Sequence, residues 1–171
     1  MLQACACIAE KNLVLLYLSD VKSSLKIHQL ASGTFVKDLK LSIGAVGSLS
    51  GRRHDNELFY SHASYLNPGL IYRYSFETEK ITEFFETKLG EPFDKEAFET
   101  KQVFYESKDG TKIPMFIVAR KNVALTGENP AMLYGYGGFS VAITPAFSPT
   151  WLMFMKHLNG IIAVANIRGG G

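Results

Sequence analysis

Apolar and polar positions alternate with a period of two over much of the first half of the chain. Leu25 and Ile27 stand between polar neighbours, and the run from Leu70 to Phe76 alternates in the same way. Successive side chains of a strand point to opposite faces, so this pattern predicts half-buried β-strands. Turns such as Asn67-Pro68-Gly69 separate the runs, since proline presets φ and glycine accepts the positive φ that follows. Up to about Thr87 we predict roughly six to eight short strands and no helix.

The strand pattern is repeated once, weakly. Leu15–Tyr17 followed by Leu25–Ile27 is similar to Leu58–Tyr60 followed by Leu70–Tyr72, at an offset of about 43 to 45 residues, the length of a four-stranded propeller blade. A β-sandwich places strands at the same spacing, so the spacing leaves both architectures open. The charged stretch 79–101 predicts a crossing segment with one outer strand, ending in a linker.

The second half begins with a predicted hairpin. Runs at 102–105 and 113–120 flank Asp109-Gly110, and Asp-Gly between two apolar runs is a strong hairpin signal. Pro114 lies inside the second run. A proline cannot donate a hydrogen bond to a neighbouring strand, so we expect that strand to be an edge strand or to carry a bulge.

The hairpin is followed by a strand, helix and strand pattern. Apolar runs at 130–134 and 161–165 predict two buried strands of a parallel pair. Between them, Ser148 is a favourable N-cap, Pro149 suits the first helical position and Gly160 suits the C-terminal end. The apolar stripe of this predicted helix consists of Trp151, Phe154, Met155 and Leu158. The second half therefore begins an α/β domain.

Composition and charge exclude several classes of protein. The 171 residues are 47% hydrophobic and 20% charged, which is typical of a globular chain. Eighteen basic and sixteen acidic residues give a net charge of +2, so we expect neither a nucleic-acid binder nor an acidic tail protein. No apolar run is long enough for a membrane span, and the first residues do not resemble a signal peptide.

The two cysteines, Cys5 and Cys7, are too few for a disulfide framework or a structural zinc site. We expect both to be small buried residues, and no metal to be bound. Together with the missing signal peptide, this cysteine usage predicts a reducing, cytoplasmic location.

The motif that carries candidate chemistry is Leu133-Tyr134-Gly135-Tyr136-Gly137-Gly138-Phe139. It follows a predicted parallel strand, and α/β proteins bind ligands at the carboxyl ends of such strands. Glycines let the backbone approach a substrate carbonyl, and a tyrosine hydroxyl can donate a hydrogen bond to a developing oxyanion. A tight turn with two packed tyrosines is the other interpretation, and the motif by itself leaves both open.

Longer motifs resemble the prolyl oligopeptidase family. They are Ser107–Ile117, Leu133–Phe139 and Ala163–Gly171, all long and specific. In the first half, Leu16–Leu18 with Asp20-Val21-Lys22, and Ser64–Tyr72, are similar to the same family. The resemblance spans nearly the whole chain and is weakest at 1–10 and at about 77–100.

The resemblance implies a mixed architecture. Residues 1–92 would form the last two blades of a seven-bladed β-propeller, and it stays open whether the first of them is complete. Residues 93–171 would begin an α/β-hydrolase peptidase domain with a hairpin, a strand, the oxyanion loop, a helix and a strand. Tyr136 matches the tyrosine of the family's oxyanion hole, and Phe139 matches an aromatic residue of the pocket that receives the substrate proline.

The activity implied is that of a cytosolic serine endopeptidase that cleaves short peptides after proline. Such an enzyme needs no metal or organic cofactor, and we expect the full-length protein to be monomeric. The chain contains no Gly-x-Ser-x-Gly motif, and none of its histidines matches the family's catalytic histidine. We therefore expect an internal or truncated fragment that lacks the Ser/Asp/His triad and is inactive alone. The alternative is a non-catalytic product that acts through a binding partner.

Overall fold

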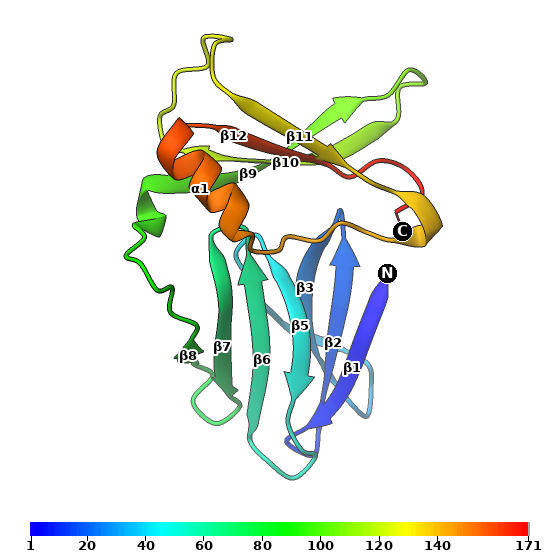
Figure 1. Ribbon diagram of the computed structural model, residues 1–171. Coiled ribbons are helices and arrows are strands. Elements are labelled where there is room, and N and C mark those ends of the chain that lie inside the picture. Colours follow the sequence, from blue (N-terminus) through cyan, green and yellow to red (C-terminus); the bar gives the residue numbers. More distant parts are fainter. Residues whose placement is uncertain (171) are drawn as a thin grey trace.

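The computed structural model describes residues 1–170, which form three four-stranded sheets and one α-helix (Figure 1). The strands of the first two sheets are β1 (Leu2–Ile8), β2 (Asn12–Ser19), β3 (Lys22–Gln29), β4 (Phe35–Leu39), β5 (Ala45–Ser50), β6 (Glu57–Ser64), β7 (Asn67–Ser75) and β8 (Ile81–Glu86). The third sheet contains β9 (Phe98–Glu106), β10 (Lys112–Arg120), β11 (Ala131–Gly135) and β12 (Ile161–Ala165), and the helix is α1 (Pro149–Leu158). Short 3₁₀ turns lie at Lys95–Ala97 and Gly138–Ser140.

The first two sheets are antiparallel, with their strands in sequence order, β1-β2-β3-β4 and β5-β6-β7-β8. Tight turns join neighbouring strands, as at Ser19↔Lys22 between β2 and β3. Because apolar and polar residues alternate along the strands, each sheet has one apolar face, and the apolar faces of the two sheets pack against each other. The buried residues between them are Ile8, Ala9, Val14, Leu16, Leu25, Ile27, Leu39, Leu58, Tyr60 and Tyr74. Eight strands without a helix confirm the pattern predicted for this half.

The third sheet is mixed, with the order β11-β12-β10-β9. β9 and β10 form an antiparallel hairpin around Ser107–Thr111, as the Asp-Gly pair predicts. β11 and β12 are parallel and are joined through α1. The helix begins as expected, because the Ser148 hydroxyl accepts a hydrogen bond from the Trp151 N–H. Its last residue is Leu158, and the C-cap in the left-handed conformation is Asn159 (φ 49°), one residue before the Gly160 suggested by the sequence.

The structure corrects the prediction for Pro114. β10 lies between β12 and β9, so it is not an edge strand, and its register with β9 runs without a bulge. The ladder with β12 covers only Met115–Val118, and the Pro114 carbonyl accepts from the Asn166 N–H just beyond it. Because Pro114 lies past the end of β12, its missing N–H breaks no ladder bond.

Two expectations about burial are also wrong. On α1, Leu158 is exposed and Leu152 is buried, because the helix packs through its middle and its last turn extends into solvent. On β1, Cys5 is exposed and Cys7 is half-buried, whereas Ala4 and Ala6 on the opposite face pack on the core. Alternation along the strand therefore turns the cysteines away from the core.

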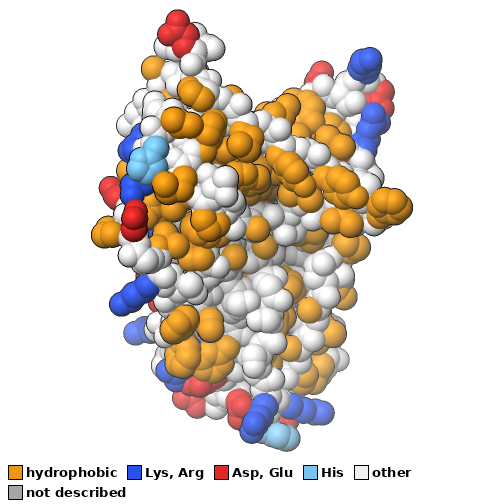
Figure 2. Space-filling model, viewed as in Figure 1, with side chains coloured by type: hydrophobic (Ala, Val, Ile, Leu, Met, Phe, Trp, Pro, Cys, Tyr) orange, Lys and Arg blue, Asp and Glu red, His pale blue; other side chains and the backbone are white. Residues whose placement is uncertain are grey.

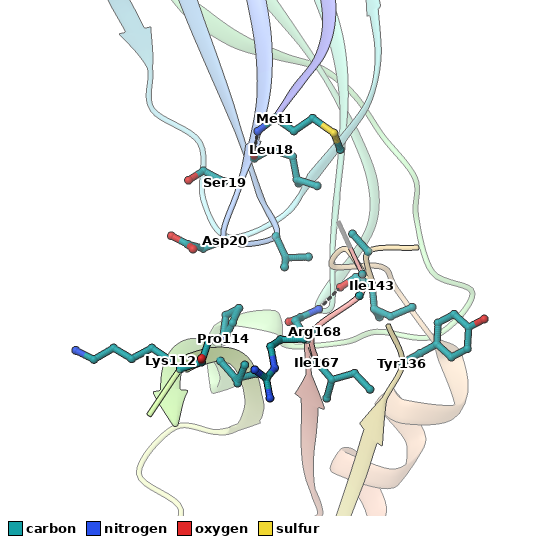
Figure 3. A pocket seen from close by; sticks show the side chains of 17 residues that line it. Met1, Leu18, Ser19, Asp20, Lys112, Pro114, Tyr136, Ile143, Ile167 and Arg168 are labelled. Atoms are coloured by element: carbon teal, nitrogen blue, oxygen red, sulfur yellow. Dashed lines mark hydrogen bonds between the residues drawn. The ribbon is translucent and has the colours of Figure 1, made fainter. Parts of the chain in front are cut away.

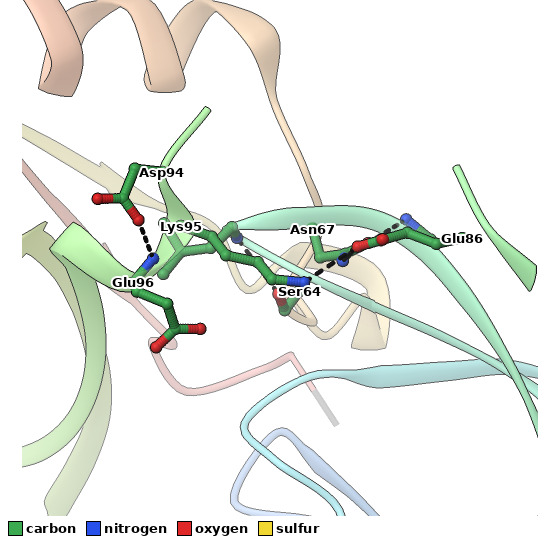
Figure 4. A network of polar contacts seen from close by, with 8 residues as sticks. Ser64, Asn67, Glu86, Asp94, Lys95 and Glu96 are labelled. Carbon is green, nitrogen blue, oxygen red and sulfur yellow. Dashed lines mark hydrogen bonds and ion pairs between the residues drawn. The ribbon is translucent and has the colours of Figure 1, made fainter. Parts of the chain in front are cut away.

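The third sheet lies across the ends of the first two, with α1 between it and the tops of β6 and β7 (Figure 1). Tyr65, in the turn between β6 and β7, is buried in a second core with Phe116 and the helix residue Trp151, at ring-centroid distances of 5.6 and 6.0 Å. The connection after β8 is also held, because Glu86 accepts hydrogen bonds from Asn67 Nδ2 and Lys95 Nζ, each 3.0 Å long (Figure 4). The two halves of the chain are thus packed together through side chains and through the linker.

Hydrophobic side chains gather over the third sheet and in a patch at the lower left of Figure 2, where Figure 1 places β8. Leu133 on β11, and Phe84 and Phe85 on β8, are large hydrophobic residues that are exposed. Within residues 1–170 no helix combines the length and the apolar character that crossing a membrane requires.

Candidate active-site loop

The glycine-rich loop, residues 135–141, leaves the carboxyl end of β11. The neighbouring strand β12 runs parallel to β11, with Gly135 opposite Ala165. The segment that follows β12, residues 166–170 and here called the bracing loop, therefore leaves the same edge of the sheet. This is the edge at which parallel sheets bind ligands.

The two loops touch through their backbones. A Cβ atom on Gly137 would lie 2.6 Å from the Arg168 carbonyl oxygen and 2.7 Å from that of Ile167. Gly169 has a φ of +94°, and a Cβ there would lie 2.5 Å from the Gly137 carbonyl oxygen. No side chain fits at either position, so Gly137 and Gly169 are explained by close backbone contact.

Tyr136 and Phe139 are both presented to solvent on the glycine-rich loop. Tyr136 is 39% exposed, and its hydroxyl lies close to the backbone of Gly138. Phe139 is 96% exposed and has φ 54° and ψ 33°, in the left-handed region that bulky residues rarely occupy. A strained, exposed aromatic residue is typical of functional sites rather than of packing. The two candidate residues therefore share one loop, and the Phe139 ring does not serve the core of residues 1–170.

The bracing loop is tied to its surroundings by two polar side chains. Asn166 is 8% exposed, and its Nδ2 donates a hydrogen bond of 2.8 Å to the carbonyl of Ile143, beyond the glycine-rich loop. The Arg168 guanidinium pairs with Asp109 at 2.5 Å and donates to the Ser107 hydroxyl at 3.1 Å. Together with the Thr111 N–H, Arg168 lowers the pKa of Asp109 to about 2, so the carboxylate is charged at neutral pH.

A cleft of about 410 Å³ lies beside these loops, between them and the turn that joins β2 and β3. Its lining includes Asp20, Lys112, Tyr136, Asn166 and Arg168. Figure 3 shows Tyr136 and Ile167 at the tips of the two neighbouring strands, with the Tyr136 hydroxyl pointing away from Arg168. In the described part of the chain, no group of three or more His, Cys, Asp or Glu side chains is arranged to hold a metal ion.

The roles of Asp109, Asn166 and Arg168 in holding the loops were not predicted from the sequence. The available signal was the position of Asn166-Ile167-Arg168-Gly169-Gly170 directly after a buried parallel strand. That position is the same as the position of the glycine-rich loop after β11, so the two motifs could have been expected at one edge of the sheet.

Comparison with known proteins identifies the family. A family model described as "Prolyl oligopeptidase, N-terminal beta-propeller domain" matches residues 1–86. The chain belongs to the prolyl oligopeptidase family. This finding agrees with the resemblance seen in the sequence motifs, and it decides between the two architectures that the strand spacing left open, in favour of a propeller.

Relatives match well beyond the propeller region. The prolyl oligopeptidase ophP of Omphalotus olearius is 40% identical over 163 residues, covering 95% of this chain and 22% of the relative. The prolyl endopeptidase of Elizabethkingia miricola is 39% identical over 156 residues, covering 91% of this chain and 22% of the relative. The chain thus spans about a fifth of the length of these curated family members.

Solved structures of the family share the fold. The apo structure of prolyl oligopeptidase B from Galerina marginata superposes with a TM-score of 0.87 at 39% identity, covering 99% of this chain and 24% of that chain. A mutant of that protein, bound to a 35mer hydrolysis and macrocyclization substrate, also gives a TM-score of 0.87 over the same shares of the two chains. The arrangement of all three sheets is therefore that of a prolyl oligopeptidase segment.

Proposed function

We propose that this chain is part of a serine endopeptidase that hydrolyses the bond after proline in short peptides. In the whole enzyme a serine hydroxyl attacks the carbonyl carbon of the proline residue, the C–N bond to the following residue breaks, and an acyl-enzyme forms. A histidine takes the proton from the serine and gives it to the departing amine, and water then hydrolyses the acyl-enzyme and releases the acid. We assign the serine, aspartate and histidine to the part of the relatives that this chain does not span, because its 171 residues contain no Gly-x-Ser-x-Gly motif.

The observation that supports this proposal is the loop at the end of β11. It presents a partly exposed tyrosine and, three residues later, a fully exposed phenylalanine, on a backbone held by close contact with the bracing loop. We assign the Tyr136 hydroxyl as a donor to the oxyanion, because a phenol O–H can donate a hydrogen bond that stabilises the negatively charged oxygen. We assign the Phe139 ring to the pocket that receives the substrate proline.

The domain arrangement belongs to the same proposal. Residues 1–92 supply the last two propeller blades, which correspond to the two antiparallel sheets, and residues 93–171 begin the α/β-hydrolase domain. We place the enzyme in the cytoplasm as a monomer. Acyl transfer by serine requires no cofactor.

The test uses the full-length protein with a chromogenic peptide whose leaving group follows proline. We expect turnover that a serine-directed organophosphate abolishes, and slower turnover of the matched peptide with alanine in place of proline. The 171-residue chain by itself should give no turnover, since it has no nucleophilic serine in an elbow motif. Lack of cleavage by the full-length protein, or cleavage insensitive to the organophosphate, would contradict the proposal.

A further inference from the structure

We propose that the bracing loop, residues 166–170, is a clamp that positions the glycine-rich loop for catalysis, with Asn166 and Arg168 as its positioning residues. The inference rests on the proposed function, because it concerns the placement of the Tyr136 hydroxyl. We assign neither residue a contact with the reacting atoms. Both act through the backbone that carries Tyr136.

The first step is the contact between the loops. Gly137, next to Tyr136, lies against the carbonyl groups of Ile167 and Arg168, and Gly169 lies against the Gly137 carbonyl. Because backbone atoms touch here with no flexible side chain between them, a displacement of residues 167–169 also displaces residue 137. The position of Tyr136 therefore depends on where the bracing loop is held.

The second step is what holds the bracing loop at its start. The Asn166 N–H donates to the Pro114 carbonyl at 2.9 Å, which continues the sheet by one bond beyond β12. Its buried side-chain amide donates to the Ile143 carbonyl at 2.8 Å. Asn166 thus connects β10 to the segment that follows the glycine-rich loop, from inside the protein.

The third step is the anchor at the surface. Arg168 binds Asp109 and Ser107, which lie in the turn of the β9–β10 hairpin. That turn is itself held by hydrogen bonds, from the Gly110 N–H to the Ser107 carbonyl at 2.9 Å and from the Thr111 N–H to Asp109 at 3.2 Å. One carboxylate oxygen of Asp109 accepts the hydrogen bond from the Thr111 N–H, and the other binds Arg168. The arginine therefore connects the bracing loop to the turn of the β9–β10 hairpin.

These contacts set the size of the expected effects. The Arg168–Asp109 pair is half-exposed, and exposed ion pairs contribute little, so its loss should change the rate by only about three- to tenfold. The Asn166 amide is buried, and removal of a buried hydrogen-bond donor costs more than removal of an exposed ion pair. We therefore expect kcat to fall about tenfold or more in Asn166→Asp. Small displacements at a catalytic site have large consequences for rate, which makes both effects measurable.

The first experiment compares Arg168→Gln, Arg168→Lys and Asn166→Asp in the full-length protein. Arg168→Gln should lower kcat by about three- to tenfold with little change in KM, and Arg168→Lys should recover part of the loss because it restores the charge. Arg73→Gln is the matched control, since Arg73 forms a similarly exposed pair with Glu57 on β6, far from these loops. An unchanged kcat in Arg168→Gln, or an equal fall in Arg73→Gln, overturns the positioning role.

The second experiment repeats Arg168→Gln in a protein that already carries Tyr136→Phe. If the arginine acts through the Tyr136 hydroxyl, its removal should then change kcat by less than about twofold, because the group being positioned is gone. A general loss of stability would lower the rate equally in both backgrounds. Equal losses in the two backgrounds overturn the inference.

A third measurement needs no catalysis and separates this inference from the proposed function. Hydrogen exchange of the amides of residues 136–141 should become about threefold or more faster in Arg168→Gln and stay unchanged in Arg73→Gln. If the parental protein cleaves no prolyl peptide, the proposed function fails, and faster exchange would still support the clamp. Exchange that is unchanged in Arg168→Gln overturns the clamp whatever the activity.

Discussion

At the scale of single residues, the proposed chemistry depends on one hydroxyl. The carbonyl oxygen of a bound peptide is weakly charged, whereas the tetrahedral oxygen carries nearly a full negative charge, so a donor aimed at the second position accelerates the chemical step. Tyr136→Phe keeps the ring of a residue that is 39% exposed, so folding should change little. We predict a fall of about 10²–10³ in kcat, measured as single-turnover rates in the full-length protein. A raised KM with parental kcat would instead make Tyr136 a substrate-positioning residue.

Phe139→Ala provides the contrast that makes this prediction specific. The side chain is almost fully exposed and packs on nothing in residues 1–170, so its removal should leave stability unchanged. Because it is assigned to the proline pocket, we expect a higher KM and a weaker preference for proline over alanine, together with a lower rate. An unchanged preference would remove Phe139 from the pocket.

His62 on β6 predicts a pH dependence of stability. It is 3% exposed, and burial lowers its pKa from 6.5, partly opposed by the hydrogen bond to the Ser42 carbonyl. The unfolded chain therefore takes up a proton below about pH 6.5 that the folded protein resists, so the free energy of unfolding falls as the pH drops through that range. Urea unfolding at pH 7.5 and 5.5 should show this fall, and His62→Phe should reduce it. An equal fall between the two pH values in His62→Phe would show that another group causes it.

At the scale of elements, helix α1 connects β11 to β12, and the residues at its first turn determine where it begins. The Ser148 hydroxyl accepts a hydrogen bond from the Trp151 N–H, and Pro149 follows at the first helical position. Ser148→Ala removes the cap, so we predict a loss of about 1 kcal/mol in the free energy of unfolding. Thr150→Ala, at an exposed position in the same turn, is the matched control and should cost nothing. Equal stability of the two variants in urea unfolding would show that the cap contributes nothing.

At the scale of the whole molecule, Tyr65 joins the two halves of the chain. It is carried by the turn between β6 and β7, but its ring packs with Phe116 and Trp151 in the core of the third sheet. Its buried hydroxyl has no hydrogen-bond partner within residues 1–170, and the ring carries the contact. Burial of this group also raises the pKa of the Tyr65 phenol, so it stays neutral.

Two variants of Tyr65 should therefore differ strongly. Tyr65→Phe removes a buried hydroxyl that has no hydrogen-bond partner within residues 1–170, so the melting temperature should stay the same or rise. Tyr65→Ala removes the ring and leaves a cavity, and we expect a loss of about 3–5 kcal/mol. Thermal unfolding of the full-length protein measures both, and a large loss in Tyr65→Phe would reveal a partner for the hydroxyl outside this chain.

The sequence by itself determined the features that depend on neighbours along the chain. Alternation predicted the strands of the first half, Asp109-Gly110 predicted the hairpin, and Ser148 with Pro149 predicted the start of the helix. In each case the physical cause is local: side-chain period, turn conformation or an unpaired backbone group lies within a few residues. The long motifs also indicated the family, because each is a continuous run of specific residues that can be compared without knowing how the chain folds.

Only the tertiary structure decided which distant segments meet. Arg168 and Asp109 are 59 residues apart, and Asn166 and Ile143 are 23 apart, so no local pattern indicates that they bind each other. The same holds for Tyr65, whose side chain leaves its own sheet for another core. Pairing of this kind depends on the order of strands in a sheet and on how sheets pack, and those are set by the burial of the whole chain rather than by any one segment.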